Sequence, residues 1–406
     1  MMRKILDFKF VFLILFVDLS ALLYGISTLS ISEDEAKIYF NGSNLLYYFT
    51  HFGTLLFGQN DFGLRFVFLL FHFLSCILLF LLALKYTKKM SDSIFSLLLF
   101  ILLPGSVASA LLVNEASFVI LLSLALLCAY EYKKKWLFYP LFVLVLFVDK
   151  SFGILFLTFF FFGIYKKNHF LYSLSLVLFI VSIFYYGFDT GGRPRGYFLD
   201  TLGIFAACFS PLVFVYFFYV IYRLAFKKDK SLLWFLMTTT FIFCSLLSLR
   251  QKLYLEDFLP FCVICTPLLI KTLMQSYRVR LPKFRLKYKI FIECAGIFLL
   301  FCYFVIVANK ILYDFIDEPK RHFAYNYHLA KELSVELKRE GIDSLRVAPE
   351  LQKRLAFYGI KNSEFFYLKA LKKGEILNPK FKTIRIFLGK HQKIYQIKSF
   401  ESEKSL

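Results

Sequence analysis

Charged residues are scarce in this chain of 406 residues: they make up 19% of it, and the acidic kind is the rarer, with 28 Asp and Glu against 49 Lys and Arg. A soluble domain usually has about 25% charged and about 45–50% apolar residues, whereas 59% of this chain is hydrophobic. This composition excludes a soluble enzyme. Together with only 18 Gly and 10 Pro, it also excludes collagen, a coiled coil and a disordered chain.

Cysteine is scarce as well, and the eight that are present all lie in apolar stretches, so no disulfide framework is indicated. Cys262 and Cys265 form a CxxC pattern without a second ligand pair, which favours small packing residues over a metal site.

Residues 8–28 follow a basic start but have no small-residue cleavage site after them. We therefore expect this segment to be a first membrane helix and not a signal peptide.

Apolar runs bounded by charge predict eleven membrane spans, which at about 20 residues each would use roughly 220 residues. The spans are 8–28, 64–84, 92–112, 116–130, 136–148, 151–165, 169–187, 200–222, 231–249, 256–275 and 290–310. If the N-terminus is cytoplasmic, the inward segments carry 22 Lys and Arg and the short outward ones seven. This bias predicts a cytoplasmic N-terminus and an external C-terminus. It also explains the net charge of +21 without nucleic acid as a partner.

After residue 310 the composition becomes polar, with 19 Lys and Arg against 12 Asp and Glu and no further span. Residues 325–340 have apolar positions at helical spacing, and the pattern ends at Gly341. The segments SLRVA, TIRIFLG and KIYQIKSF are typical of short strands. The sequence therefore predicts an all-α polytopic membrane domain over residues 1–310 and a small periplasmic α/β domain over residues 311–406.

The first outward loop, residues 29–63, combines acids with aromatic residues suited to the membrane surface. Glu33, Asp34 and Glu35 follow the first span directly. A carboxylate held there can take a proton from the hydroxyl or amine of an acceptor, or coordinate a metal. The alternative is that the acids only stabilise the first turn of a helix.

This loop resembles the first-loop signature of the polytopic GT-C glycosyltransferases, above all family 39, which includes bacterial aminoarabinose transferase and protein O-mannosyltransferases. The matching residues in the loop and the second span are Asp34, Glu35, Ala36, Tyr39, Phe57, Gly58, Gly63 and Arg65. The order continues with Glu115 as a second acid, Lys150 and Gly153 as a Lys-Gly motif, and an Arg/Tyr-rich segment that begins at Arg250. The likeness covers roughly residues 10–275. The sequence lacks the family's His-Pro-Pro, however, and His51 is the only imidazole nearby.

The resemblance implies transfer of a sugar from a polyprenyl-phosphate carrier to a lipid A, glycan or protein acceptor at the periplasmic face of a bacterial inner membrane. It implies Asp34 as catalytic base or acceptor-orienting acid, with Glu35 and Glu115 as further acids. It leaves open whether a divalent metal, Mg or Mn, is bound by Asp34 and Glu115.

A phosphate leaving group requires cationic stabilisation. Basic residues on the outward loops oppose the orientation bias and are the candidates for binding the donor phosphate. They are Arg65, Lys150, Arg193, Arg195, Arg250 and Lys252. The alternative is that they only pair with neighbouring acids. Asp18, in the middle of the first span, is expected to have a structural partner such as His72 or a hydroxyl group.

Two other classes of function remain open. A secondary transporter predicts broken or charged helices near the midplane, and a non-catalytic envelope scaffold predicts a C-terminal module that binds partners. The transferase hypothesis requires that Asp34, Glu115 and Lys150 converge in one wet cavity at the outer rim of the bilayer.

Overall fold

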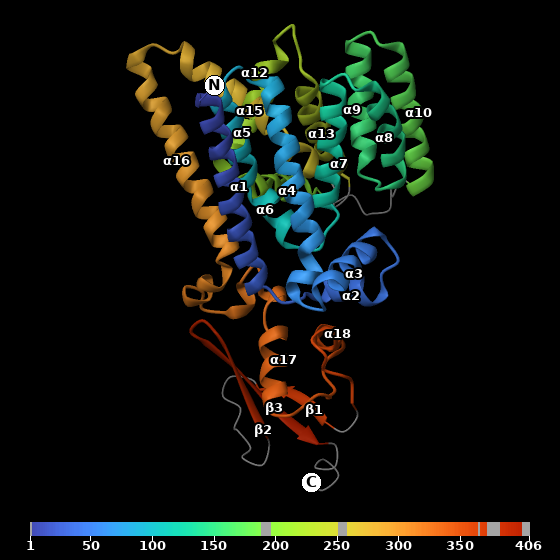
Figure 1. Ribbon diagram of the computed structural model, residues 1–406, viewed down its shortest axis with the longest axis vertical. Helices are drawn as coiled ribbons and strands as arrows, with labels where there is room; N and C mark the ends of the chain where they lie inside the picture. Colours follow the sequence, from blue (N-terminus) through green and yellow to red (C-terminus); the bar gives the residue numbers. More distant parts are fainter. Residues whose placement is uncertain (1, 188–195, 251–257, 364–365, 372–381, 400–406) are drawn as a thin grey trace. The chain divides into compact units, whose positions relative to one another are not determined.

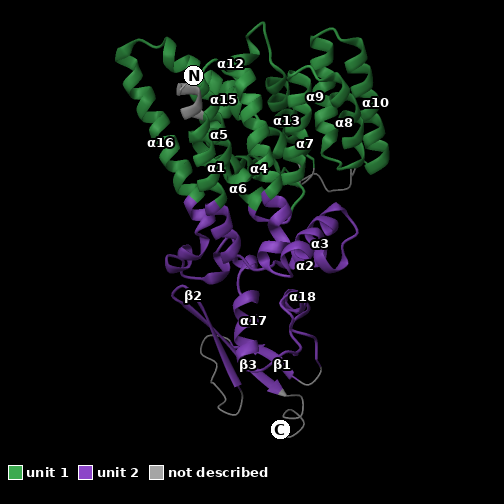
Figure 2. Ribbon diagram, in the orientation of Figure 1, with its two compact units in different colours: residues 1–19, 70–110, 114–303 green, residues 20–69, 111–113, 304–406 purple. Residues whose placement is uncertain are grey.

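The computed structural model describes residues 2–187, 196–250, 258–363, 366–371 and 382–399. The chain divides into two compact units, which Figure 2 shows in different colours. Unit 1 comprises residues 1–19, 70–110 and 114–303, and unit 2 comprises residues 20–69, 111–113 and 304–406. Unit 2 thus joins the first outward loop to the C-terminal segment, a different division from the predicted boundary at residue 310.

Unit 1 is built from helices, several of which continue into unit 2 (Figure 1). The helices are α1 (Met2–Thr28), α4 (Asp61–Tyr86), α5 (Met90–Leu102), α6 (Pro104–Leu111), α7 (Ala116–Glu131), α8 (Lys135–Leu144), α9 (Phe152–Tyr165), α10 (His169–Tyr186), α11 (Phe198–Phe209), α12 (Pro211–Ala225), α13 (Leu232–Ser248), α14 (Pro260–Val263), α15 (Thr266–Val279) and α16 (Pro282–Val307). They bury a core of mainly Leu and Phe side chains.

Most helices lie within or near the predicted spans, but most are too short to cross a bilayer alone. Helix α16 begins at Pro282 and not at residue 290, and the described part of the predicted span 256–275 is divided between α14 and α15. Within the described residues, four helices are long and apolar enough, or six if two bent pairs are each one span. Five further apolar helices have 10–17 residues. The expected count of eleven therefore stays a prediction.

Two predicted spans are bent. Helices α5 and α6 meet at 61°, and α11 and α12 meet at 107°. The second break falls at Ser210, whose φ is 66°, directly before Pro211. Proline cannot donate a backbone hydrogen bond and starts a new helix readily. The predicted span 200–222 is thus divided into two helices that are sharply bent at Ser210.

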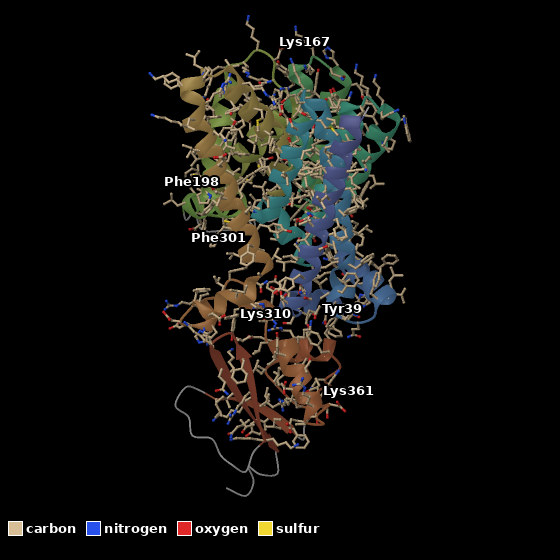
Figure 3. The ribbon with its side chains drawn as sticks, turned by 60° about the vertical axis from the view of Figure 1, so that its left-hand side comes forward. Tyr39, Lys167, Phe198, Phe301, Lys310 and Lys361 are labelled. Carbon is tan, nitrogen blue, oxygen red and sulfur yellow. The ribbon has the colours of Figure 1, made fainter. Side chains whose placement is uncertain are left out.

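Lipid exposure explains the apolar surface of the outermost helices. The apolar window of α16 is only 11% buried. Phe301, labelled in Figure 3, lies on this helix and is 61% exposed. A helix that is apolar all round and largely uncovered by protein is typical of a membrane span. This supports a multi-pass membrane protein.

Unit 2 contains the loop helices α2 (Glu33–Asn41) and α3 (Leu45–Phe57), the helices α17 (Ala330–Arg339) and α18 (Pro349–Phe357), and three strands. The strands are β1 (Phe366–Ala370), β2 (Lys382–Leu388) and β3 (His391–Ser399), and they form an antiparallel sheet of order β1-β3-β2. In β2, Ile384, Ile386 and Leu388 are buried at every second position, the pattern of a half-buried strand.

The predicted elements of this unit are largely confirmed. Helix α17 and strands β2 and β3 lie where the pattern predicted them. SLRVA makes only isolated bridges, at Ser344 and Arg346. Its prediction as a strand is wrong. Helix α18 and strand β1 were not predicted.

Candidate functional site

The three acids of the first loop begin helix α2. Ser32 caps the helix: its side chain accepts a hydrogen bond from the backbone N–H of Glu35, and the Glu35 carboxylate accepts one from the Ser32 N–H at 3.0 Å. This reciprocal arrangement is a capping box. Carboxylates in the first turn also interact favourably with the helix dipole. The acids therefore do stabilise the helix start, as the alternative interpretation expected.

Glu35 has a second role, because it is paired with a buried arginine. Its Oε2 atom lies 2.7 Å from Nη2 of Arg65, and the two side chains are 2% and 0% exposed. Oε1 of Glu35 accepts a hydrogen bond from the backbone N–H of Val113 at 3.0 Å. Arg65 also donates to the carbonyls of Leu29 and Ser30. The pair thus joins the start of α2, the start of α4 and residue 113.

Asp61 extends this buried network. Its Oδ1 atom lies 3.9 Å from Nη1 of Arg65 and accepts a hydrogen bond from the Tyr358 hydroxyl, and its Oδ2 atom lies 2.8 Å from Nζ of Lys331. The Tyr358 oxygen in turn accepts from the Ile31 N–H at 2.9 Å. Burial and the Asp61 carboxylate raise the pKa of Tyr358 above its usual range. The hydroxyl therefore stays a donor.

Arg354 fixes the backbone that precedes α2. Its Nε donates to the Ile31 carbonyl and its Nη2 to the His328 carbonyl, both at 2.8 Å. Burial lowers the pKa of Arg354 from its ordinary value. The loop N–H of Ser30 bonds to the Tyr327 carbonyl at 2.7 Å. The C-terminal segment thus supplies hydrogen-bond partners to the first loop along its length.

Asp34 is exposed, in contrast to the adjacent Glu35. Its side chain is 89% exposed and lies 3.4 Å from Nζ of Lys37, which is closer, at 2.6 Å, to Glu33. The adjacent Glu33 and Asp34 carboxylates raise the pKa of Lys37. Of the acids predicted to be catalytic in this loop, Asp34 is accessible to a substrate and Glu35 is not.

Aromatic rings surround His51 on the loop. The ring of Tyr39, labelled in Figure 3, stacks on the His51 ring with centroids 4.4 Å apart, and it meets Phe357 of α18 edge-on at 5.1 Å. Nδ1 of His51 lies 2.9 Å from the Tyr47 carbonyl. This cluster packs α18 against α2 within unit 2.

Local backbone geometry explains why glycine occupies positions 58 and 63, between α3 and α4. Gly58 ends α3 with a φ of 81°, in the left-handed region that favours glycine. A Cβ on Gly63 would lie 2.4 Å from the Gly58 carbonyl oxygen. Asn60 accepts from the Gly63 N–H at 2.8 Å and so caps α4. This tight turn places Arg65 on the first buried turn of α4.

The other predicted residues lie in unit 1 or outside the described residues. Glu115 is the exposed N-cap residue of α7, and Lys150 is exposed in the turn before α9. Glu115 and Asp149 both lie within electrostatic range of Tyr186. Arg250 is exposed after α13. Arg193, Arg195 and Lys252 lie outside the described residues.

The roles predicted for these residues, and the convergence of Asp34, Glu115 and Lys150, stay predictions. Arg65 also stays a predicted phosphate ligand, although its charge faces Glu35 and Asp61 in this structure.

Asp18 has the partners expected from the sequence. Its carboxylate lies 3.1 Å from Nε2 of His72 and accepts a hydrogen bond from the Tyr303 hydroxyl at 2.8 Å. Asp18 and His72, together with Cys76, form the single group of three possible metal ligands found in the described part of the chain. Neither Asp34 nor Glu115 belongs to such a group among the described residues, and their predicted role as metal ligands stays a prediction.

Comparison with known proteins identifies the fold. No protein-family model matches the sequence, and no curated protein matches it significantly. Among solved structures, ArnT from Cupriavidus metallidurans in the apo state matches with a TM-score of 0.53 and 12% identity, covering 86% of this chain and 84% of that one. The chain has the ArnT fold. The structure of ArnT bound to undecaprenyl phosphate matches with a TM-score of 0.50 and 10% identity, covering 97% and 98% of the two chains.

The predicted likeness is thus confirmed at the level of the fold, which this chain shares with ArnT. The sequence did not reveal which residues of the C-terminal segment contact the first loop within unit 2. Lys331, Arg354 and Tyr358 lie about 300 residues from their partners. No local signal in the sequence points to them.

Proposed function

We propose that this chain is a membrane glycosyltransferase that takes a sugar from a polyprenyl-phosphate donor. The observation that carries the proposal is the shared fold with ArnT over 97% of the chain, since one of the two ArnT structures holds undecaprenyl phosphate. A lipid A, glycan or protein acceptor at the periplasmic face of a bacterial inner membrane completes the proposed reaction.

Asp34 is the proposed base. Its carboxylate takes the proton from the acceptor hydroxyl or amine, the freed oxygen or nitrogen bonds to the sugar's anomeric carbon, and the bond from that carbon to the phosphate oxygen breaks. The polyprenyl phosphate leaves with the electron pair. An exposed carboxylate on a helix that is fixed by buried contacts suits this role, because a base must reach the proton in a defined geometry.

Glu35 is the proposed positioning residue. Both of its oxygens are occupied by Arg65, Ser32 and Val113, which supports a role in holding the first turn of α2 over a role as a second base. Glu115 is the proposed second acid. Lys150, Arg250, Arg193 and Arg195 are the proposed ligands of the donor phosphate, whose leaving charge they stabilise.

The test compares Asp34→Asn with Glu33→Gln in a deletion strain. Both variants remove one charge from neighbouring exposed acids that lie near Lys37. Mass spectrometry of envelope lipids and glycans should show that deletion removes a sugar-bearing species. Glu33→Gln should restore it, whereas Asp34→Asn should leave transfer about 100-fold or more below the parent, as expected for loss of a general base.

Controls separate this function from the rival ones. Both variants should unfold at the temperature of the parent, because neither side chain is buried. If deletion removes no sugar-bearing species, or if Asp34→Asn restores transfer, the transferase proposal is wrong. A scaffold or a transporter would then be the better explanation.

A further inference from the structure

A basic cavity lies in unit 1, away from the first loop in sequence. It has a volume of about 330 Å³ and forms where the ends of α4, α7, α9 and α13 meet the middle of α15. Lys167, labelled in Figure 3, follows the C-terminal end of α9 in the sequence. The charged and hydroxyl-bearing side chains that the argument uses are Lys85, Tyr86, Glu131, Lys166, Lys230 and Lys271.

The charges in this cavity do not balance. Four lysines face one carboxylate, that of Glu131, which accepts a hydrogen bond from the Tyr86 hydroxyl at 2.6 Å. Among the described residues, no ion pair includes any of these four lysines. Ammonium groups gathered around one hollow repel one another, most strongly where they are partly removed from water. The surplus of positive charge therefore favours an anion.

Two of the lysines have a structural explanation. Lys85 and Lys166 lie at the C-terminal ends of α4 and α9, where the helix dipole favours cations. Lys230 lies before the N-terminus of α13, where the dipole disfavours a cation and attracts an anion. Lys271 is half-buried inside α15, away from either helix end.

Aromatic rings hold these two lysines at the cavity. Nζ of Lys230 lies 4.7 Å from the centroid of Trp234, and Nζ of Lys271 lies 5.6 Å from that of Tyr86. Cation–π contacts orient an ammonium group but leave its charge in place. The two ammonium groups are thus fixed at the hollow and remain available to an oxyanion.

We propose that this cavity binds a phosphate-bearing anion. Basic pockets between membrane helices on the cytoplasmic side are suited to phospholipid headgroups, and these helix ends are the ones that the charge bias predicts to be cytoplasmic. The phosphate comes from an anionic lipid headgroup or from a soluble phosphate. The residues of this cavity belong to unit 1 and the first loop belongs to unit 2, and the proposal does not depend on the glycosyltransferase function.

The test measures binding to the purified full-length chain by native mass spectrometry in detergent. The probes are dioleoyl phosphatidylglycerol, the neutral dioleoyl phosphatidylcholine and inorganic phosphate. The variant Lys230→Gln/Lys271→Gln removes the two fixed charges. Its matched control, Lys283→Gln/Lys287→Gln, removes two exposed charges from α16 outside the cavity.

We expect the cavity variant to bind its anion about 30-fold more weakly, because each lysine near an anionic headgroup contributes about fivefold. The control should bind as the parent does. If phosphatidylglycerol alone shows this difference, the ligand is a lipid headgroup. If inorganic phosphate shows it too, a soluble phosphate suffices. Equal losses in both variants, or no binding of either anion, would overturn the proposal.

The unfolding temperature of each variant provides a check on folding. Both double variants keep a long polar side chain at each position, and neither breaks an ion pair between described residues. A cavity variant that unfolds like the parent and still binds both phosphatidylglycerol and inorganic phosphate as tightly would refute the site. Sugar transfer is measured separately, so failure here leaves the proposed function standing.

Discussion

Replacing Glu35 by Gln tests whether the buried ion pair holds the first loop in place. The Glu35 and Arg65 side chains are 2% and 0% exposed. Removing one partner of such a pair leaves an uncompensated buried charge and typically costs about 3–5 kcal/mol. Asp61, 3.9 Å from the guanidinium, still offsets part of that charge. We therefore expect a loss of about 3 kcal/mol in the free energy of opening of the loop.

Hydrogen exchange measured by mass spectrometry over residues 29–66 reports this local opening directly. Glu35→Gln should exchange faster there by roughly a hundredfold, since 1.4 kcal/mol is about a factor of ten. The sheet of unit 2 serves as an internal reference.

A double-mutant cycle makes the reasoning refutable. In Glu35→Gln/Arg65→Met, the unpaired charge on Arg65 is absent, so the loss should be smaller than the sum of the two single losses by about 2 kcal/mol. If the losses simply add, or if Glu35→Gln costs less than about 1 kcal/mol, the pair does not hold the loop.

Two further predictions concern unit 2. Burial lowers the pKa of His328 to about 3 from 6.5, so the neutral ring is the folded form. The contribution of the neutral ring to the free energy of unfolding is complete above pH 6.5. Below that pH, the free energy of unfolding falls by about 1.4 kcal/mol per pH unit, because the unfolded chain binds a proton that the folded chain does not. The full-length chain should unfold at lower temperature at pH 5 than at pH 7, and His328→Gln should flatten that dependence; an unchanged slope would contradict this. Gly63→Ala should destabilise the loop by about 2 kcal/mol, because its Cβ would lie 2.4 Å from the Gly58 carbonyl oxygen. Thermal unfolding measures this loss, with Gly196→Ala, where nothing lies within 4 Å, as the control.

Much of the fold could be predicted from local pattern. Long apolar runs located α1, α4 and α16 because hydrocarbon length sets helix length. The alternation of Ile384, Ile386 and Leu388 located β2 because successive strand residues face opposite sides. Helix α18 was missed because its short amphipathic segment carries a weak signal.

The candidate site could be predicted only in part. Asp34 and Glu35 were found because they follow a span directly and match a family pattern. Their different surroundings were not foreseeable, since adjacent residues on a helix point in different directions. Glu35 is buried because it pairs with Arg65, which lies 30 residues further along the chain, whereas Asp34 has no such buried partner among the described residues.

The sequence by itself determined that the chain is a helical membrane protein with a small polar C-terminal module, because both properties depend on composition and on short-range periodicity. The tertiary structure alone decided which charges of the first loop meet partners far away in the sequence. It paired Glu35 with Arg65 and Asp61 with Tyr358 and Lys331, and it gathered four lysines around one cavity. Electrostatic interactions act across space and fall with distance, so separation along the chain carries no information about them.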